Sequence, residues 1–155
     1  MSLRPTIIAR TDIVLEARRW IGTPYLHQGS LLHVGCDCLG LVRGVWRALL
    51  GPEPEKSGAY SPDWAEAGRI DRLYEAGRRH FHEVDAGGFD AGDVLLFRWR
   101  SNVAAKHLGI ATSRKTMIHA HEGACVCEIE IGPLWRRKLA AAFAFPGVNA
   151  MTRHR

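Results

Sequence analysis

The feature that most constrains this chain is a cysteine at the expected start of an amphipathic helix. Apolar residues after Cys38 recur at the spacing of one helix face, at Leu41, Val42, Val45, Trp46, Leu49 and Leu50. Asp37 stands just before the first helical position, where a carboxylate can accept hydrogen bonds from exposed backbone N–H groups. Those groups and the positive end of the helix dipole favour thiolate over thiol. The pattern therefore predicts a nucleophilic cysteine.

Such a nucleophile requires a base, and two histidines lie in segments typical of short strands. His107–Ala111 and Thr116–His119 are predicted strands, joined by a polar turn over residues 112–115. A turn centred on residue 113 makes His107 and His119 direct cross-strand neighbours, whereas a turn centred on residue 114 pairs His107 with His121. A base and the group that orients it need that proximity. Spacing alone leaves the partner of His107 open between His119 and His121.

The rest of the chain places helices before strands. Helices are expected over residues 11–21 with Thr11 as N-cap, from Cys38 to Leu50, and over residues 62–80. Strands are expected over residues 94–99, 107–111, 116–119, 125–131 and 140–145. This order predicts an α+β fold in which helices pack on an antiparallel sheet of about five strands. Gly40 and Gly44 share one stripe of the nucleophile helix, which indicates close approach of another element.

Composition indicates one domain with a substantial core, since 46% of the 155 residues are hydrophobic. We expect an N-terminal arm over residues 1–10, the domain over residues 11–146 and a basic tail over residues 147–155. No stretch approaches ~18 consecutive apolar residues, so no membrane span is expected. The N-terminus lacks the apolar core of a signal peptide, which predicts synthesis in the cytoplasm.

Metal and nucleic-acid functions are less favoured than catalysis. The cysteines form two Cys-x-Cys pairs, Cys36/Cys38 and Cys125/Cys127, which is closer than the usual ligand spacing of a structural zinc site. We therefore expect no metal, cofactor or disulfide. The net charge of +5 is interpreted as a solvated basic face, because no motif with interleaved aromatic residues indicates direct nucleic-acid binding.

Five short motifs occur in order along the chain. They are Gly22-Thr23-Pro24-Tyr25, Asp37-Cys38-Leu39-Gly40-Leu41-Val42, Gly92-Asp93-Val94-Leu95-Leu96-Phe97, His107-Leu108-Gly109-Ile110 and Ile118-His119-Ala120. Together they resemble the NlpC-type cell-wall peptidases, a bacterial branch of the papain-like cysteine peptidases, over about residues 13–146. Two features resemble the branch found in phage and phage-like tails, including gene-transfer-agent-like particles. They are the form Asp37-Cys38-Leu39-Gly40-Leu41 of the second motif and the ending Trp135…Phe143-Ala144-Phe145-Pro146.

The resemblance implies a papain-like fold and a role for each matched residue. Cys38 is the implied nucleophile, His107 the base and His119 the residue that orients His107. Tyr25 matches a tyrosine near the oxyanion and substrate, and Asp37 matches an aspartate that helps to hold the amino end of the substrate. The implied reaction is cleavage of peptidoglycan stem peptides, usually between γ-D-glutamate and diaminopimelate. One departure is Leu39, where many members have serine.

A cell-wall substrate lies beyond the inner membrane, so a cytoplasmic product needs a carrier. We expect a phage-like tail to deliver the enzyme to the periplasmic wall, with tail hub or tip proteins as partners. Two alternatives stay open. One is a structural tail-hub subunit with little activity, and the other is an amidase or acyltransferase on the same fold.

Overall fold

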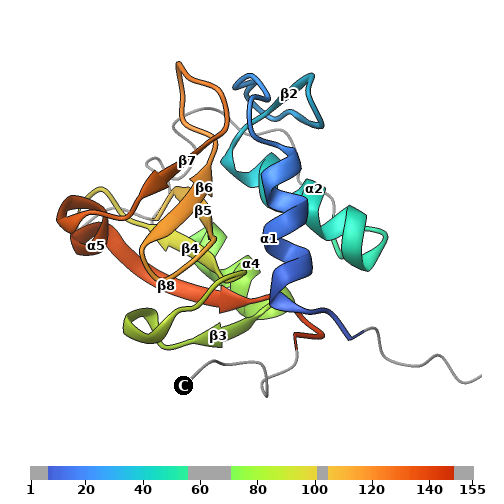
Figure 1. The fold of residues 1–155 in the computed structure, drawn as a ribbon. Helices are drawn as coiled ribbons and strands as arrows, with labels where there is room; N and C mark the ends of the chain where they lie inside the picture. Colours follow the sequence, from blue (N-terminus) through green and yellow to red (C-terminus); the bar gives the residue numbers. More distant parts are fainter. Residues whose placement is uncertain (1–6, 56–70, 101–104, 149–155) are drawn as a thin grey trace, which may run out of the picture.

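The computed structural model describes residues 7–55, 71–100 and 105–148 of the chain and has the expected α+β architecture. A six-stranded antiparallel sheet in the order β3-β8-β4-β5-β6-β7 forms one layer, and α1 and α2 lie against one side of it (Figure 1). The helices are α1 (Arg10–Arg19), α2 (Cys38–Leu50), α4 (Arg72–His80), the 3-10 turn η1 (Ala86–Gly88) and α5 (Pro133–Lys138). The sheet strands are β3 (His82–Val84), β4 (Val94–Phe97), β5 (His107–Ala111), β6 (Thr116–His119), β7 (Cys127–Glu130) and β8 (Leu139–Ala144).

Helix α2 begins at Cys38, as the sequence predicts, and Asp37 is its N-cap. The Asp37 carboxylate accepts a hydrogen bond from the Gly40 backbone N–H at 2.7 Å. Leu41 and Val45 are fully buried, so the apolar face of α2 packs into the core. The cap and this face together fix where the helix starts and how it is rotated.

Gly40 and Gly44 confirm the close approach that their spacing predicts. A Cβ on Gly40 would lie only 1.7 Å from the Gly29 carbonyl oxygen, and one on Gly44 would lie 2.0 Å from the Trp20 ring. The loop over residues 26–37 carries the short strands β1 (Ser30–Leu31) and β2 (Gly35–Cys36). Glycine at position 40 therefore lets this loop pack directly on the first turn of α2.

The first helix starts earlier than predicted. It begins at Arg10 with Ala9 as the N-cap, so Thr11 is not the cap; the Asp12 carboxylate accepts from the Ala9 backbone N–H at 3.2 Å. Arg10 is buried because its guanidinium forms a 2.7 Å ion pair with Asp93, which is 1% exposed. This pair ties the start of α1 to the start of β4.

Backbone pairing joins the two ends of the described part of the chain. Ile8 is 3% exposed, pairs with Val148 in a parallel bridge and donates its N–H to the Gly147 carbonyl at 2.9 Å. The two ends of the domain thus hold each other through backbone pairing, which no sequence periodicity signals. Most of the expected arm over residues 1–10 and of the expected tail over residues 147–155 lies outside the described part of the chain.

The sheet has one strand more than predicted. The added strand, β3, pairs with β8 and is short and mostly exposed, so it carries no hydrophobic alternation. Strand β7 covers only Cys127–Glu130 of the strand expected over residues 125–131. Helix α4 is the second half of the helix expected over residues 62–80, and residues 62–70 lie outside the described part of the chain. No helix among the described residues is long and apolar enough to cross a membrane.

Candidate active site

Cys38 lies where the start of α2 meets the start of β5. Its thiol is 3.7 Å from the carbonyl oxygen of Lys106, the residue before His107. A cleft opens over this junction, and its walls come from the loop before α2, from α2 itself, from β5 and from the segment after β6. The lining residues are Tyr25, His27, Asp37, Cys38, Leu39, Trp99, Lys106, His107, Ala120, His121 and Glu122.

His107 and His119 form a buried hydrogen-bonded pair beside this cleft. His107 Nε2 lies 2.9 Å from His119 Nδ1, and the two rings meet edge to face at 83°. His107 is 6% exposed and His119 is 3% exposed. The contact expected between these two histidines is therefore present.

The strand register that produces this contact is the second of the two that the spacing of the histidines leaves open. Ile110 pairs with Ile118 and Ala111 with Met117, which centres the hairpin on residue 114 rather than 113. His119 is consequently a diagonal neighbour of His107, at a separation that long or aromatic side chains can bridge. Strand β6 ends at His119, so His121 is exposed, although its ring centroid still lies 5.7 Å from that of His107.

Burial favours the neutral forms of the Cys38 thiol and of the two histidines. It raises the pKa of the Cys38 thiol to about 12, with the Asp37 carboxylate adding to the effect. Backbone N–H groups of Leu108, Leu39 and Cys38 act in the opposite direction but are outweighed. Loss of solvation on burial therefore opposes the preference for thiolate that the helix start gives, and it is the larger of the two effects.

The two imidazoles are neutral for the same reason. Burial, followed by the electrostatic influence of His119, His121 and Lys106, lowers the pKa of His107 to about 3. Burial and then His121 lower the pKa of His119 to about 4. The resting site is a neutral thiol beside a neutral imidazole pair.

Two tryptophans enclose the histidine pair, and sequence reasoning gave neither a role. Trp99 stacks on His107 with ring centroids 5.7 Å apart and an interplanar angle of 23°. Trp135, on α5, lies 5.5 Å from the His107 ring and 5.4 Å from the His119 ring. These rings exclude water from the imidazoles. Trp135 begins the C-terminal motif that ends at Pro146, but only the fold shows that α5 lies beside the histidine pair.

Tyr25 and Asp37 both reach the cleft, but in different ways. Tyr25 is half-buried, and burial followed by the negative charge of Asp37 raises its pKa to about 12, so the hydroxyl keeps its proton. Asp37 is 4% exposed and its second oxygen accepts the Gln28 backbone N–H at 2.8 Å. Asp37 thus fastens the loop to α2 while its charge borders the cleft.

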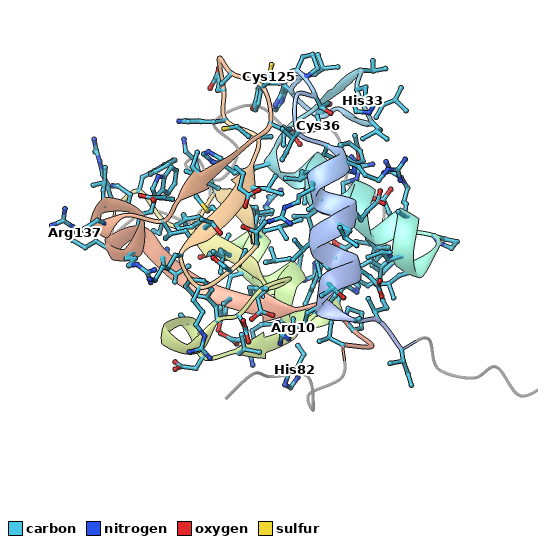
Figure 2. All side chains as sticks on the ribbon, viewed as in Figure 1. Arg10, His33, Cys36, His82, Cys125 and Arg137 are labelled. Atoms are coloured by element: carbon cyan, nitrogen blue, oxygen red, sulfur yellow. The ribbon has the colours of Figure 1, made fainter. Side chains whose placement is uncertain are left out.

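All four cysteines are free thiols. Cys36 is fully buried and Cys125 is exposed, and Figure 2 shows the two at the same end of the molecule. Both flank the Pro24-Tyr25 segment, since Pro24 pairs with Cys125 and Tyr25 pairs with Cys36. Within residues 7–55, 71–100 and 105–148, no group of three or more histidine, cysteine or acidic side chains is arranged to hold a metal ion.

Comparison with known proteins identifies the class to which this fold and site belong. The sequence profile of the NlpC/P60 family matches residues 22–143, and the chain belongs to that family, whose members are cell-wall hydrolases. The fold resembles the crystal structure of the NlpC/p60 domain of the peptidoglycan hydrolase SagA. The two share 24% identity and a TM-score of 0.62 over 89% of this chain and 100% of that one.

Two further relatives are similar over most of this chain. An NlpC/P60 family protein from Bacillus cereus ATCC 10987 has a TM-score of 0.64 at 19% identity, over 90% of this chain and 41% of that one. Gamma-DL-glutamyl hydrolase of Bacillus subtilis (strain 168) is 30% identical over 112 residues, or 72% of this chain. The match spans only 23% of that hydrolase.

The depressed histidine pKa values predict that acid weakens the fold. Between pH 6.5 and 5, His107 and His119 become protonated in the unfolded chain but stay neutral in the folded chain. The unfolded state therefore binds more protons, and the free energy of unfolding decreases as the pH is lowered. The slope reaches at most about 1.4 kcal/mol per pH unit for each histidine. Urea unfolding at pH 7, 6, 5.5 and 5 measures it.

His119→Gln should flatten this slope, whereas His82→Gln, at an exposed position on β3, should leave it unchanged (Figure 2). A urea midpoint that stays constant or rises as the pH falls from 6.5 to 5 would contradict the neutral-pair assignment.

Proposed function

We propose that this protein hydrolyses peptidoglycan stem peptides at the bond between γ-D-glutamate and diaminopimelate. In this proposal Cys38 is the nucleophile, His107 the general base and His119 the residue that orients His107. The observation that carries it is the buried His107–His119 hydrogen bond beside the start of α2, with the thiol at the same junction. Thiol-dependent acyl transfer requires a nucleophile, a base within its reach and a group that orients the base.

The reaction starts from the neutral thiol. Cys38 Sγ attacks the γ-carbonyl carbon while His107 takes the thiol proton, through Nδ1 because Nε2 is hydrogen-bonded to His119. The backbone N–H of Cys38, at the N-terminus of α2, stabilises the oxyanion together with the Tyr25 hydroxyl. His107 then gives the proton to the leaving amine as the C–N bond breaks. Water, activated by His107, releases the γ-glutamyl product and regenerates the thiol.

The substrate side of the proposal uses Asp37 and the relatives. The Asp37 carboxylate borders the cleft and supplies a negative charge toward the amino end of the peptide. Leu39 lines the cleft where many relatives have serine, so this wall offers an apolar contact instead of a hydroxyl. The γ-glutamyl bond is supported by the similarity to the Bacillus subtilis gamma-DL-glutamyl hydrolase.

Digestion of purified diaminopimelate-type peptidoglycan tests the proposal. We expect soluble fragments that end in γ-D-glutamate and fragments that begin with a free diaminopimelate amine, identified by mass spectrometry. New termini at the muramyl–alanine bond would point to an amidase, and transfer of the acyl group to an added amine would point to an acyltransferase.

We further propose that a phage-like or gene-transfer-agent-like tail carries this enzyme to the wall. The support is the form of the Asp37 to Val42 motif and the ending from Trp135 to Pro146, which resemble tail-associated members. Purified particles should then contain the chain at low copy near the tail tip or hub. Its absence from every particle fraction would contradict this delivery route.

A further inference from the structure

A second groove lies next to the catalytic cleft and is strongly basic. It is formed where the end of β4 meets α5 and the start of β8. The lining residues are Arg98, Trp99, Arg100, Leu134, Arg137, Lys138, Leu139 and Ala140, so the described lining has four basic side chains and no acidic one. Figure 2 shows Arg137 projecting from the α5 corner of the molecule. A groove with this charge suits an anionic ligand.

The basic side chains differ in how they are held. Arg98 forms a 2.7 Å ion pair with Asp71, and Lys138 Nζ donates to the Trp99 carbonyl at 3.0 Å while lying 5.4 Å from the centroid of the Trp99 ring. Arg100 and Arg137 are exposed. Arg98 and Lys138 are therefore held in the wall of the groove, and Arg100 and Arg137 are accessible to a ligand.

Trp99 joins this groove to the catalytic cleft, because the same side chain lines both. The Trp99 ring stacks on the His107 ring, and the ammonium group of Lys138 lies over the Trp99 ring. His107 protonates the leaving amine in the proposed reaction, so the leaving fragment lies on the His107 side of the thiol. The leaving fragment therefore extends toward Trp99 and the basic groove.

We propose that the basic groove is a subsite for the leaving half of the stem peptide and binds its carboxylates. This inference rests on the proposed function. Diaminopimelate and the D-alanine that follows it carry carboxylates, and the guanidinium groups of Arg100 and Arg137 match them in charge and geometry. Trp99 separates this anion subsite from the thiol. The enzyme consequently prefers a leaving fragment with free carboxylates over one whose carboxylates are amidated.

The test compares two tetrapeptides, L-alanyl-γ-D-glutamyl-diaminopimelyl-D-alanine and the same peptide amidated on the diaminopimelate and D-alanine carboxylates. The wild-type protein should cleave the free acid with a kcat/KM about fivefold higher, the upper range for one exposed ion pair. Arg137→Glu should remove or reverse this preference. The preference should also shrink as salt is raised, because the groove is open to solvent.

Arg114→Glu is the matched control, since Arg114 is exposed and lies in the β5–β6 turn at the opposite end of the hairpin from His107. It makes the same change of net charge and should keep the wild-type preference. Equal loss of preference in both variants would indicate a long-range field and overturn the subsite. Unchanged preference in Arg137→Glu would overturn it as well.

Binding to the Cys38→Ala protein separates this inference from the proposed reaction. In that protein the free-acid peptide should bind more tightly than the amidated one, and adding Arg137→Glu should abolish the difference. Cleavage by the wild type without any carboxylate preference would contradict the carboxylate subsite but leave the proposed peptidase activity standing. Continued cleavage by Cys38→Ala would overturn the proposed nucleophile instead.

Discussion

Cys38→Ala is expected to lower peptidoglycan hydrolysis by at least about a thousand-fold, because a thiol nucleophile has no substitute once its sulfur is removed. The fold should persist, since Cys38 is only partly buried and alanine keeps the first turn of α2. Release of soluble wall fragments measures the loss, and urea unfolding verifies the fold.

Cys125→Ser and Cys127→Ser are the controls for this result. Cys125 is exposed and Cys127 is half-buried, and neither lines the cleft. Both variants should keep activity within about twofold, as expected for substitutions outside the core and the site. Wall hydrolysis that survives in Cys38→Ala, or disappears in either control, would contradict the assignment of Cys38 as the nucleophile.

Gly40→Ala is expected to be the most damaging conservative change outside the reacting groups. In a helix interior, alanine is more favourable than glycine by about 1 kcal/mol. The added Cβ, however, would overlap the Gly29 backbone carbonyl at 1.7 Å, and backbone cannot move aside as a flexible side chain can. We expect a net loss of roughly 2–3 kcal/mol in the free energy of unfolding, in the range of overpacked cores.

Gly87→Ala is the matched control, because a Cβ there meets only the Asp85 carboxylate at 3.6 Å, which is ordinary contact. It should change the free energy of unfolding by less than about 0.5 kcal/mol. Urea unfolding of both variants measures the difference. A Gly40→Ala protein as stable as the wild type would show that the loop does not press on α2 as described.

The start of helix α2 was predictable because its determinants are local. An Asp37 cap, an apolar stripe from Leu41 onward and two glycines on one stripe act within a few turns of chain. They set the position of Cys38 whatever the rest of the fold does. Strands β5 and β6 were predicted to the residue for a similar reason, since each is a short apolar run bounded by polar turns.

The identity of the histidine partner needed more than spacing. The sequence left His119 and His121 open, and family resemblance favoured His119. The observed register is the one that would pair His107 with His121 in an extended ladder. The pairing of β5 with β6 ends at Ile110 and Ile118, however. The Trp135 ring lies against His119, which is buried, while His121 is exposed.

What the sequence determined by itself is the class of fold and the position of the cysteine, because caps, periodicity and turns act between neighbours in the chain. Only the tertiary structure decided the protonation of the site and its second groove. Burial at the α2–β5 junction favours the neutral thiol, and burial beside Trp99 and Trp135 favours the neutral imidazoles. These segments are distant in sequence. Desolvation depends on how these segments pack, so no local pattern encodes it.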